Sequence, residues 1–159
     1  MNIEILCVGK IKESYLKEAI AEYVKRLGRY CTLKITEVDD EKTPESRSDA
    51  LTRSILAKEG ERLLRKLRDT AMVIVLAVDG KMLDSEELAD CIKKQGVSGV
   101  SNIQFVIGGS LGLSDEIRKR ADLTLSFSRM TFPHQLMRLI LLEQIYRSFR
   151  IINHEPYHK

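Results

Sequence analysis

The sequence is poor in several residue types that define special classes of protein. Its 159 residues include no tryptophan, three prolines and three cysteines. The cysteines Cys7, Cys31 and Cys91 are odd in number and far apart, which argues against a disulfide framework and against a compact zinc site. We therefore expect reduced thiols and no bound metal.

Long uncharged hydrophobic runs are also missing. No stretch approaches the roughly 18 apolar residues that a membrane-spanning helix requires. The amino-terminal residues 1–5 include the acid Glu4 and lack the basic and hydrophobic regions of a signal peptide. These absences favour a cytoplasmic protein with no membrane association.

The charge balance has little excess of either sign. The formal net charge is +3, and 43% of the residues are hydrophobic against 31% charged. This composition is typical of a folded globular chain, and the length suits one domain over residues 1–159. A nucleic-acid partner would have to be held by a local cluster of basic residues or by a patch shared between two subunits.

Apolar runs alternate with segments of helical periodicity along the whole chain. Strands are predicted at residues 3–8, 33–38, 72–78, 103–107 and 123–127, with helices after residue 10 and from residues 51, 84, 115 and 133. The pattern predicts an α/β fold with a mainly parallel sheet flanked by helices. The run 72–78 is apolar throughout, so we expect it to be central in the sheet. The polar residues 39–49 are expected to form a mobile loop.

A glycine-rich segment follows the fourth predicted strand. Residues 108–112 read Gly-Gly-Ser-Leu-Gly and lie where ligands bind in open α/β sheets. The segment fits neither the dinucleotide nor the phosphate-loop pattern. It does fit the nucleophile elbow of α/β-hydrolases, with Ser110 as nucleophile and Asp122 and His134 as partners. A plain tight turn is the third interpretation.

All three histidines, His134, His154 and His158, lie after residue 133. Histidine exchanges protons near neutral pH, so this concentration favours a catalytic role at the carboxyl-terminal end. The alternative is that His134 caps a helix and the other two belong to a solvated tail.

The predicted helix of residues 133–150 has apolar residues on more than one face. We expect one sheet to be too small to cover it, which favours a homodimer. Its remaining surface is expected to carry Arg138, Glu143, Arg147 and Arg150, although Glu143 and Arg147 could be an ordinary surface ion pair. Residues 155–159 add an aromatic, a histidine and a cation, which suit stacking on a base and contact with phosphate.

Five sequence blocks together resemble one known family. They are ILCVGK at residues 5–10, FVIGGSLG at 105–112, LSFSRMTFPHQ at 125–135, EQIYR at 143–147 and PYH at 156–158. The chain is similar over its whole length to the RlmH family of the SPOUT superfamily, whose members methylate a pseudouridine in large-subunit ribosomal RNA.

This resemblance implies a SPOUT fold with a trefoil knot in about residues 70–159 and a site for S-adenosylmethionine. It further implies a homodimer in which the tail of one subunit completes the site of the other. Three segments would bind the cofactor. They correspond to Leu76, to Gly108, and to Phe127, Ser128, Arg129, Met130, Thr131 and Phe132.

The reaction implied is methylation of N3 of a pseudouridine in 23S ribosomal RNA, with the assembled ribosome as substrate. His134, Glu143 or His158 would assist proton removal, Arg147 would position the RNA or stabilise negative charge on the base, and Tyr157 would stack on the base. RNA contacts are expected from Arg138, Arg150 and Lys159. A non-catalytic RNA-binding or assembly factor on the same fold remains open.

Overall fold

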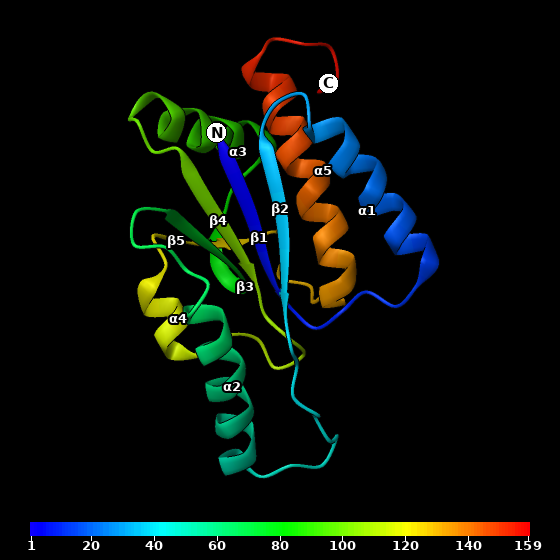
Figure 1. Ribbon diagram of the computed structural model, residues 1–159, viewed down its shortest axis with the longest axis vertical. Coiled ribbons are helices and arrows are strands. Elements are labelled where there is room, and N and C mark those ends of the chain that lie inside the picture. The colour runs from blue at the N-terminus through cyan, green and yellow to red at the C-terminus, as the bar shows by residue number, and fades with distance from the viewer.

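A five-stranded parallel sheet with helices on both faces forms the protein (Figure 1). The computed structural model describes residues 1–159. The strand order is β2-β1-β4-β3-β5, and every neighbouring pair is parallel. In chain order the elements are β1 (Asn2–Val8), α1 (Ser14–Leu27), β2 (Thr32–Val38), α2 (Asp49–Leu64), β3 (Met72–Met82), α3 (Ser85–Val97), β4 (Asn102–Ile107), α4 (Asp115–Arg120), β5 (Leu123–Ser126) and α5 (His134–Ile152).

The two faces of the sheet build two separate cores. Side chains alternate along a strand, so β1 sends Ile3, Ile5 and Cys7 to one face and Leu6 and Val8 to the other. The first face packs against α1, α3 and α5, and the second against α2 and α4. The result is the three-layer α/β/α arrangement visible in Figure 1.

The predicted α/β class and all ten elements are confirmed. The prediction that residues 72–78 are central in the sheet is confirmed in that β3 is an interior strand between β4 and the edge strand β5, although β4 is the middle strand. Only Val73, Ile74 and Val75 of β3 are buried without interruption, since the strand then runs out toward solvent. Helix α3 begins with the expected acidic residues, and Asp84 and Glu87 form a capping box there.

Helix α5 is covered within the chain more completely than its sequence predicts. It packs against the sheet and also contacts α1 on one side and α3 on the other. No α5 residue is among the large hydrophobic side chains that remain exposed. Leu136, Leu139 and Ile140 remain partly exposed, so the argument for a second subunit from apolar surface on this helix stays a prediction.

Burial also governs the cysteines. All three are free, and burial raises the pKa of the Cys7 thiol to about 12. Such a thiol is un-ionised at neutral pH and unreactive.

None of the helices combines the length and apolar character needed to cross a membrane.

The contact between α2 and α4 depends on a glycine inside a helix. A Cβ on Gly60 would lie 2.3 Å from Oγ of Ser114 and 3.0 Å from its Cβ. Ser114 cannot easily move, because its hydroxyl accepts a hydrogen bond from the Ile117 amide and so caps α4. Gly60 thus allows α2 to approach the start of α4 closely, just after the glycine-rich loop.

Gly60→Ala should lower the free energy of unfolding by about 1–3 kcal/mol, because the added methyl group overpacks this contact. The matched control is Gly96→Ala in α3, where the nearest atom is the flexible end of Met1 at 3.2 Å. We expect that change to leave stability unaltered or to raise it by up to about 1 kcal/mol. Urea unfolding followed by circular dichroism measures both, and equal effects would contradict the role of Gly60.

Candidate active site

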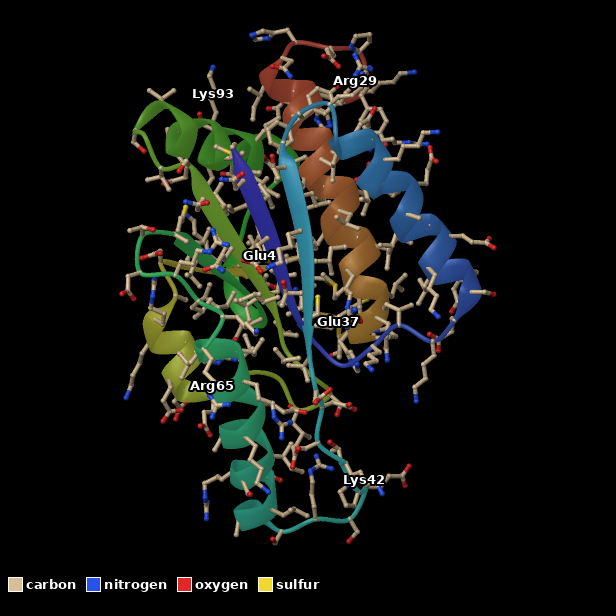
Figure 2. All side chains as sticks on the ribbon, viewed as in Figure 1. Glu4, Arg29, Glu37, Lys42, Arg65 and Lys93 are labelled. Carbon is tan, nitrogen blue, oxygen red and sulfur yellow. The ribbon has the colours of Figure 1, made fainter.

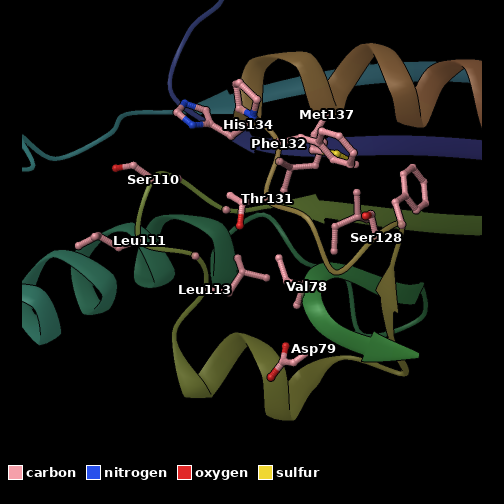
Figure 3. Close-up of a pocket in the computed structure, with 18 of the residues that line it drawn as sticks. Val78, Asp79, Ser110, Leu111, Leu113, Ser128, Thr131, Phe132, His134 and Met137 are labelled. Carbon is pink, nitrogen blue, oxygen red and sulfur yellow. The ribbon is translucent and has the colours of Figure 1, made fainter. Parts of the chain in front are cut away.

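A large cavity lies at the carboxyl ends of the strands. After the edge strand β5, residues 127–133 pass the ends of β3 and β4 and lead to α5. The first turns of α5 lie close to Gly9, which directly follows β1. Between residues 127–133 and the strand ends is a cavity of about 770 Å³ (Figure 3). Its volume suits a ligand the size of a nucleoside derivative.

Three loops and the start of α5 line this cavity, with mostly apolar side chains and exposed peptide groups. The lining residues are Leu76, Ala77, Val78, Asp79, Ile107, Gly108, Gly109, Ser110, Leu111, Gly112, Leu113, Arg118, Leu125, Phe127, Ser128, Met130, Thr131, Phe132, Pro133, His134 and Met137. The predicted cofactor residues are therefore among them with one exception. Arg129 does not line the cavity, because its side chain is exposed to solvent while its neighbours Ser128 and Met130 contribute to the wall.

The glycine-rich loop forms one wall as a closed turn. The Gly112 amide donates to the Gly109 carbonyl at 3.0 Å, and Gly112 has a φ of +89°. A Cβ on Gly108 would lie 2.4 Å from the Gly112 oxygen, so only glycine fits at this position. The tight-turn interpretation is thus correct in geometry, and the turn presents backbone to the cavity.

A register shift in β3 forms the opposite wall. Its pairing with β5 is interrupted between Leu76 and Lys81. Ser126 holds the displaced strand by donating a hydrogen bond to the Val78 carbonyl at 2.9 Å. Beside it, Asp79 and Arg118 form an ion pair at 3.0 Å, and this pair was missed because no local pattern relates two residues on different elements.

His134 stands at the first position of α5 and lines the cavity (Figure 3). Burial lowers the pKa of its imidazole below the ordinary value of 6.5, and the nearby Arg138 guanidinium lowers it further, against a smaller opposing effect of Asp40. The ring is therefore neutral at neutral pH and able to accept a proton. The prediction of His134 as a candidate base is consistent with this position.

A second, smaller cavity of about 140 Å³ adjoins the first, and no hydrophobic residue lines it. Gly109, Ser110 and His134 belong to both cavities. The remaining wall consists of Asp40, Glu41, Lys42, Thr43 and Glu59. Burial raises the pKa of the Glu59 carboxyl, partly offset by a hydrogen bond from the Glu41 amide.

Arg138 has a different place from the one predicted. It is fully buried, with 2% of its surface exposed, so the expected RNA contact is wrong for this residue. Its guanidinium donates to Glu37 at 2.6 Å and to the carbonyls of Val8 and Gly9 at 3.3 and 2.6 Å. Glu37 lies on the edge strand β2, close to the start of α5 (Figure 2). Arg138 therefore anchors α5, and with it His134, to the ends of β1 and β2.

The other predicted catalytic residues form a cluster that the cavity does not include. Glu143 accepts hydrogen bonds from Arg147 and from the Tyr157 hydroxyl, both at 2.9 Å. Arg147 also lies 4.6 Å from the Tyr157 ring centre and 3.3 Å from Nδ1 of His158. Since Arg147 is 13 residues after His134 on one helix, about 20 Å separates the cluster from the cavity along α5.

Arg150 holds the carboxyl-terminal tail in place. It donates to the Pro156 carbonyl at 2.8 Å and to the Tyr30 hydroxyl at 3.2 Å, and it pairs with Glu155. These contacts occupy the guanidinium that was expected to contact RNA, so we assign Arg150 a structural role. Lys159 is exposed, and its predicted RNA contact stays a prediction.

The hydrolase alternative does not fit this geometry. Ser110 and His134 both lie at the carboxyl ends of the strands, but Asp122 binds the amide of Val73 at the start of β3. The proposed acid is thus at the opposite end of the sheet from the proposed serine and histidine. No hydrogen bond joins Ser110 to His134, and the three residues form no triad.

Comparison with known proteins defines the class to which this fold and cavity correspond. The family described as "Predicted SPOUT methyltransferase" matches residues 1–158. The chain belongs to this family of methyltransferases.

Individual relatives are similar over the whole length. The chain is 64% identical to "Ribosomal RNA large subunit methyltransferase H" of Bifidobacterium adolescentis and 60% identical to the protein of the same name from Bacillus pumilus, each over 100% of both chains.

Two solved structures share the fold at low sequence identity. One is a probable methylase family protein from Haemophilus influenzae, with a TM-score of 0.56 and 16% identity over 99% of this chain and 70% of that one. The other is the putative methyltransferase Lpg2936 from Legionella pneumophila, determined with bound SAM. Its TM-score is 0.51, with 13% identity over 94% of this chain and 66% of that one.

Arg138→Met should lower the free energy of unfolding by about 2–4 kcal/mol, because two backbone carbonyls and Glu37 lose their donor inside the protein. The ion pair with Glu37 contributes less than a fully buried pair would, because the Glu37 side chain is 37% exposed and water can solvate its carboxylate. Urea unfolding gives the value, and Arg129→Met, at an exposed arginine, is the control with little expected change. Similar losses for both variants would show that Arg138 is no anchor.

Proposed function

We propose that this protein transfers a methyl group from S-adenosylmethionine to N3 of a pseudouridine in 23S ribosomal RNA. The observation that carries the proposal is the 770 Å³ cavity, which combines an apolar wall, a glycine turn and a neutral histidine at its edge. The ribosomal RNA substrate is that of the relatives named above, which are similar along the whole chain.

The residues of the cavity fit this cofactor. Apolar side chains such as Leu76, Leu125 and Phe132 would contact its adenine and thioether portions, while the peptide groups of the glycine turn would hydrogen-bond its polar edges. Gly108 lets the turn close, and Gly112, where a Cβ would meet no atom within 4 Å, leaves the backbone open to a ligand. When bound, S-adenosylmethionine supplies a methyl group that its positively charged sulfur already activates.

The protein then has to orient the acceptor base and remove one proton. His134 is placed to accept the N3 proton, since its ring is neutral and faces both cavities. Loss of that proton leaves an electron pair on N3 that can bond to carbon. Walls on three sides limit access of water to this position.

We further propose that the active unit is a homodimer in which the cluster of Glu143, Arg147, Tyr157 and His158 serves the cavity of the other subunit. Support comes from the distance of about 20 Å between this cluster and His134 along α5, which one chain cannot bridge. In that arrangement Arg147 would bind phosphate or the base and Tyr157 would stack on it.

Three further expectations belong to this proposal. The assembled ribosome is the expected substrate, since a net charge of +3 is too small to hold free RNA tightly. The protein is expected to act in the cytoplasm, where ribosomes are. The trefoil knot in residues 70–159 stays a prediction from the family resemblance.

His134→Gln should lower kcat for methylation of ribosomes by about 10²–10⁴-fold, because glutamine cannot accept the N3 proton. The assay measures transfer of radiolabelled methyl groups to ribosomes that lack the modification. For the parent, the acid limb of the rate profile should lie below pH 6.5, since the pKa of His134 is lowered.

Calorimetric titration with S-adenosylmethionine provides the control, because the variant should bind it about as well as the parent. A parent protein that binds the cofactor but labels no ribosomes would favour an assembly factor instead. A variant with parental kcat would remove His134 from the mechanism.

Mixing Arg147→Ala with His134→Gln should restore activity that neither variant has alone. In a mixed dimer, one of the two sites combines an intact His134 with an intact Arg147 from the other subunit. Half of the dimers in a random mixture are mixed, so the mixture should regain about a quarter of parental activity. Subunits are exchanged by mild denaturation and refolding before the methylation assay. If the mixture stays as inactive as its components, the cluster does not act across the dimer.

A further inference from the structure

The proposed function assigns no role to the small polar cavity next to His134. It opens off the large cavity at Gly109, Ser110 and His134, so whatever occupies it lies beside the proposed base. Its volume of about 140 Å³ exceeds that of several water molecules at about 30 Å³ each, and it admits a single pyrimidine ring. All eight lining residues are non-hydrophobic, which suits the polar edge of a base better than an apolar group.

Glu59 is the buried acid of this cavity. Only 4% of its surface is exposed. Its Oε2 accepts a hydrogen bond from the Glu41 amide at 2.9 Å, while Oε1 has neither a hydrogen bond nor an ion pair. Oε1 also lies 3.0 Å from the position that a Cβ on Gly109 would take, so it is next to the glycine turn. Glu59 lines the cavity, so Oε1 is free to accept a hydrogen bond from a ligand there.

The neighbouring acids are less suited to accept a hydrogen bond from a ligand. Glu41 is already paired with Arg62 at 2.7 Å and with Lys58 at 3.6 Å. Asp40 is exposed to solvent, so water competes for its oxygens. Glu59 alone combines burial with a free acceptor.

The acceptor base carries a donor that matches this oxygen. Pseudouridine is attached to its ribose through carbon, so both ring nitrogens, N1 and N3, bear hydrogen, whereas uridine has hydrogen only on N3. Building on the proposed function, we propose that Glu59 accepts the N1 hydrogen of the target base and thereby selects pseudouridine over uridine. His134 and Glu59 then engage the two different N–H groups of one ring.

Glu59→Gln provides a sharp test because it changes one oxygen to an amide nitrogen with little change in size. Its remaining oxygen is claimed by the Glu41 amide, so the NH₂ group faces the cavity and opposes a donor with a donor. We expect the parent to favour ribosomes with pseudouridine at the target over ribosomes with uridine by about 10-fold or more in kcat/KM. The variant should show a ratio near 1.

The matched control is Glu61→Gln on the same helix, where the side chain is 63% exposed and pairs with Arg65. It should keep the parental preference. Cofactor affinity by calorimetry and the midpoint of thermal unfolding confirm that each variant is folded. Glu59→Asp, which withdraws the carboxylate by one methylene, serves if Glu59→Gln does not fold, and it should reduce the preference at least about threefold.

The outcomes separate this inference from the proposed function. If the parent methylates neither kind of ribosome, the proposed function fails. If the parent methylates both equally, or if Glu59→Gln keeps the full preference, the role of Glu59 is overturned while the methyltransferase activity stands. Loss of preference in Glu59→Gln but not in Glu61→Gln supports it.

Discussion

The candidate active site depends on the hydrogen bonds and the ion pair that the buried guanidinium of Arg138 forms. This guanidinium joins the start of α5 to the carbonyls that end β1 and to Glu37 of β2, and so adds polar contacts to the apolar packing of this helix on the sheet. Because His134 lies one turn earlier on α5, the same anchor places the imidazole at the edge of both cavities. The anchor also fixes the far end of residues 127–133, which wall the larger cavity. One positive charge thus positions the proposed base and helps to keep it un-ionised.

The two cavities divide the chemistry by polarity. The larger one offers hydrocarbon and peptide groups, which suit an adenosine derivative, and the smaller one offers acids and a histidine, which suit the N–H edge of a base. Their shared residues Gly109, Ser110 and His134 lie where donor and acceptor would meet. Ser110 is therefore part of a turn between the two cavities, and its position explains why a nucleophile pattern in the sequence has no triad behind it.

The sequence predicted the fold well because the signals were local. Periodicity located the strands and helices, and the glycine turn and residues 127–132 were recognised from contiguous motifs. Contacts between distant segments left no such signal. The burial of Arg138 required the ends of β1 and β2, the Asp79–Arg118 pair required α4 beside β3, and Glu59 gained its meaning only from the loop that follows β2. Arg138 is buried and Arg150 binds the carboxyl-terminal tail, and composition alone reveals neither environment.

The contact between the end of the first strand and the last helix has a consequence for folding during synthesis. The carbonyl of Gly9 leaves the ribosome early, but its partner Arg138 follows 129 residues later. Strand β1 likewise waits for β4, whose residues pair with it at a separation of about 100 positions. Contacts of such long range slow folding, because the closure of a long loop must precede them. The glycine turn and residues 127–133 therefore leave the ribosome before the helix that holds them in place. The larger cavity is complete only after α5 has been synthesised.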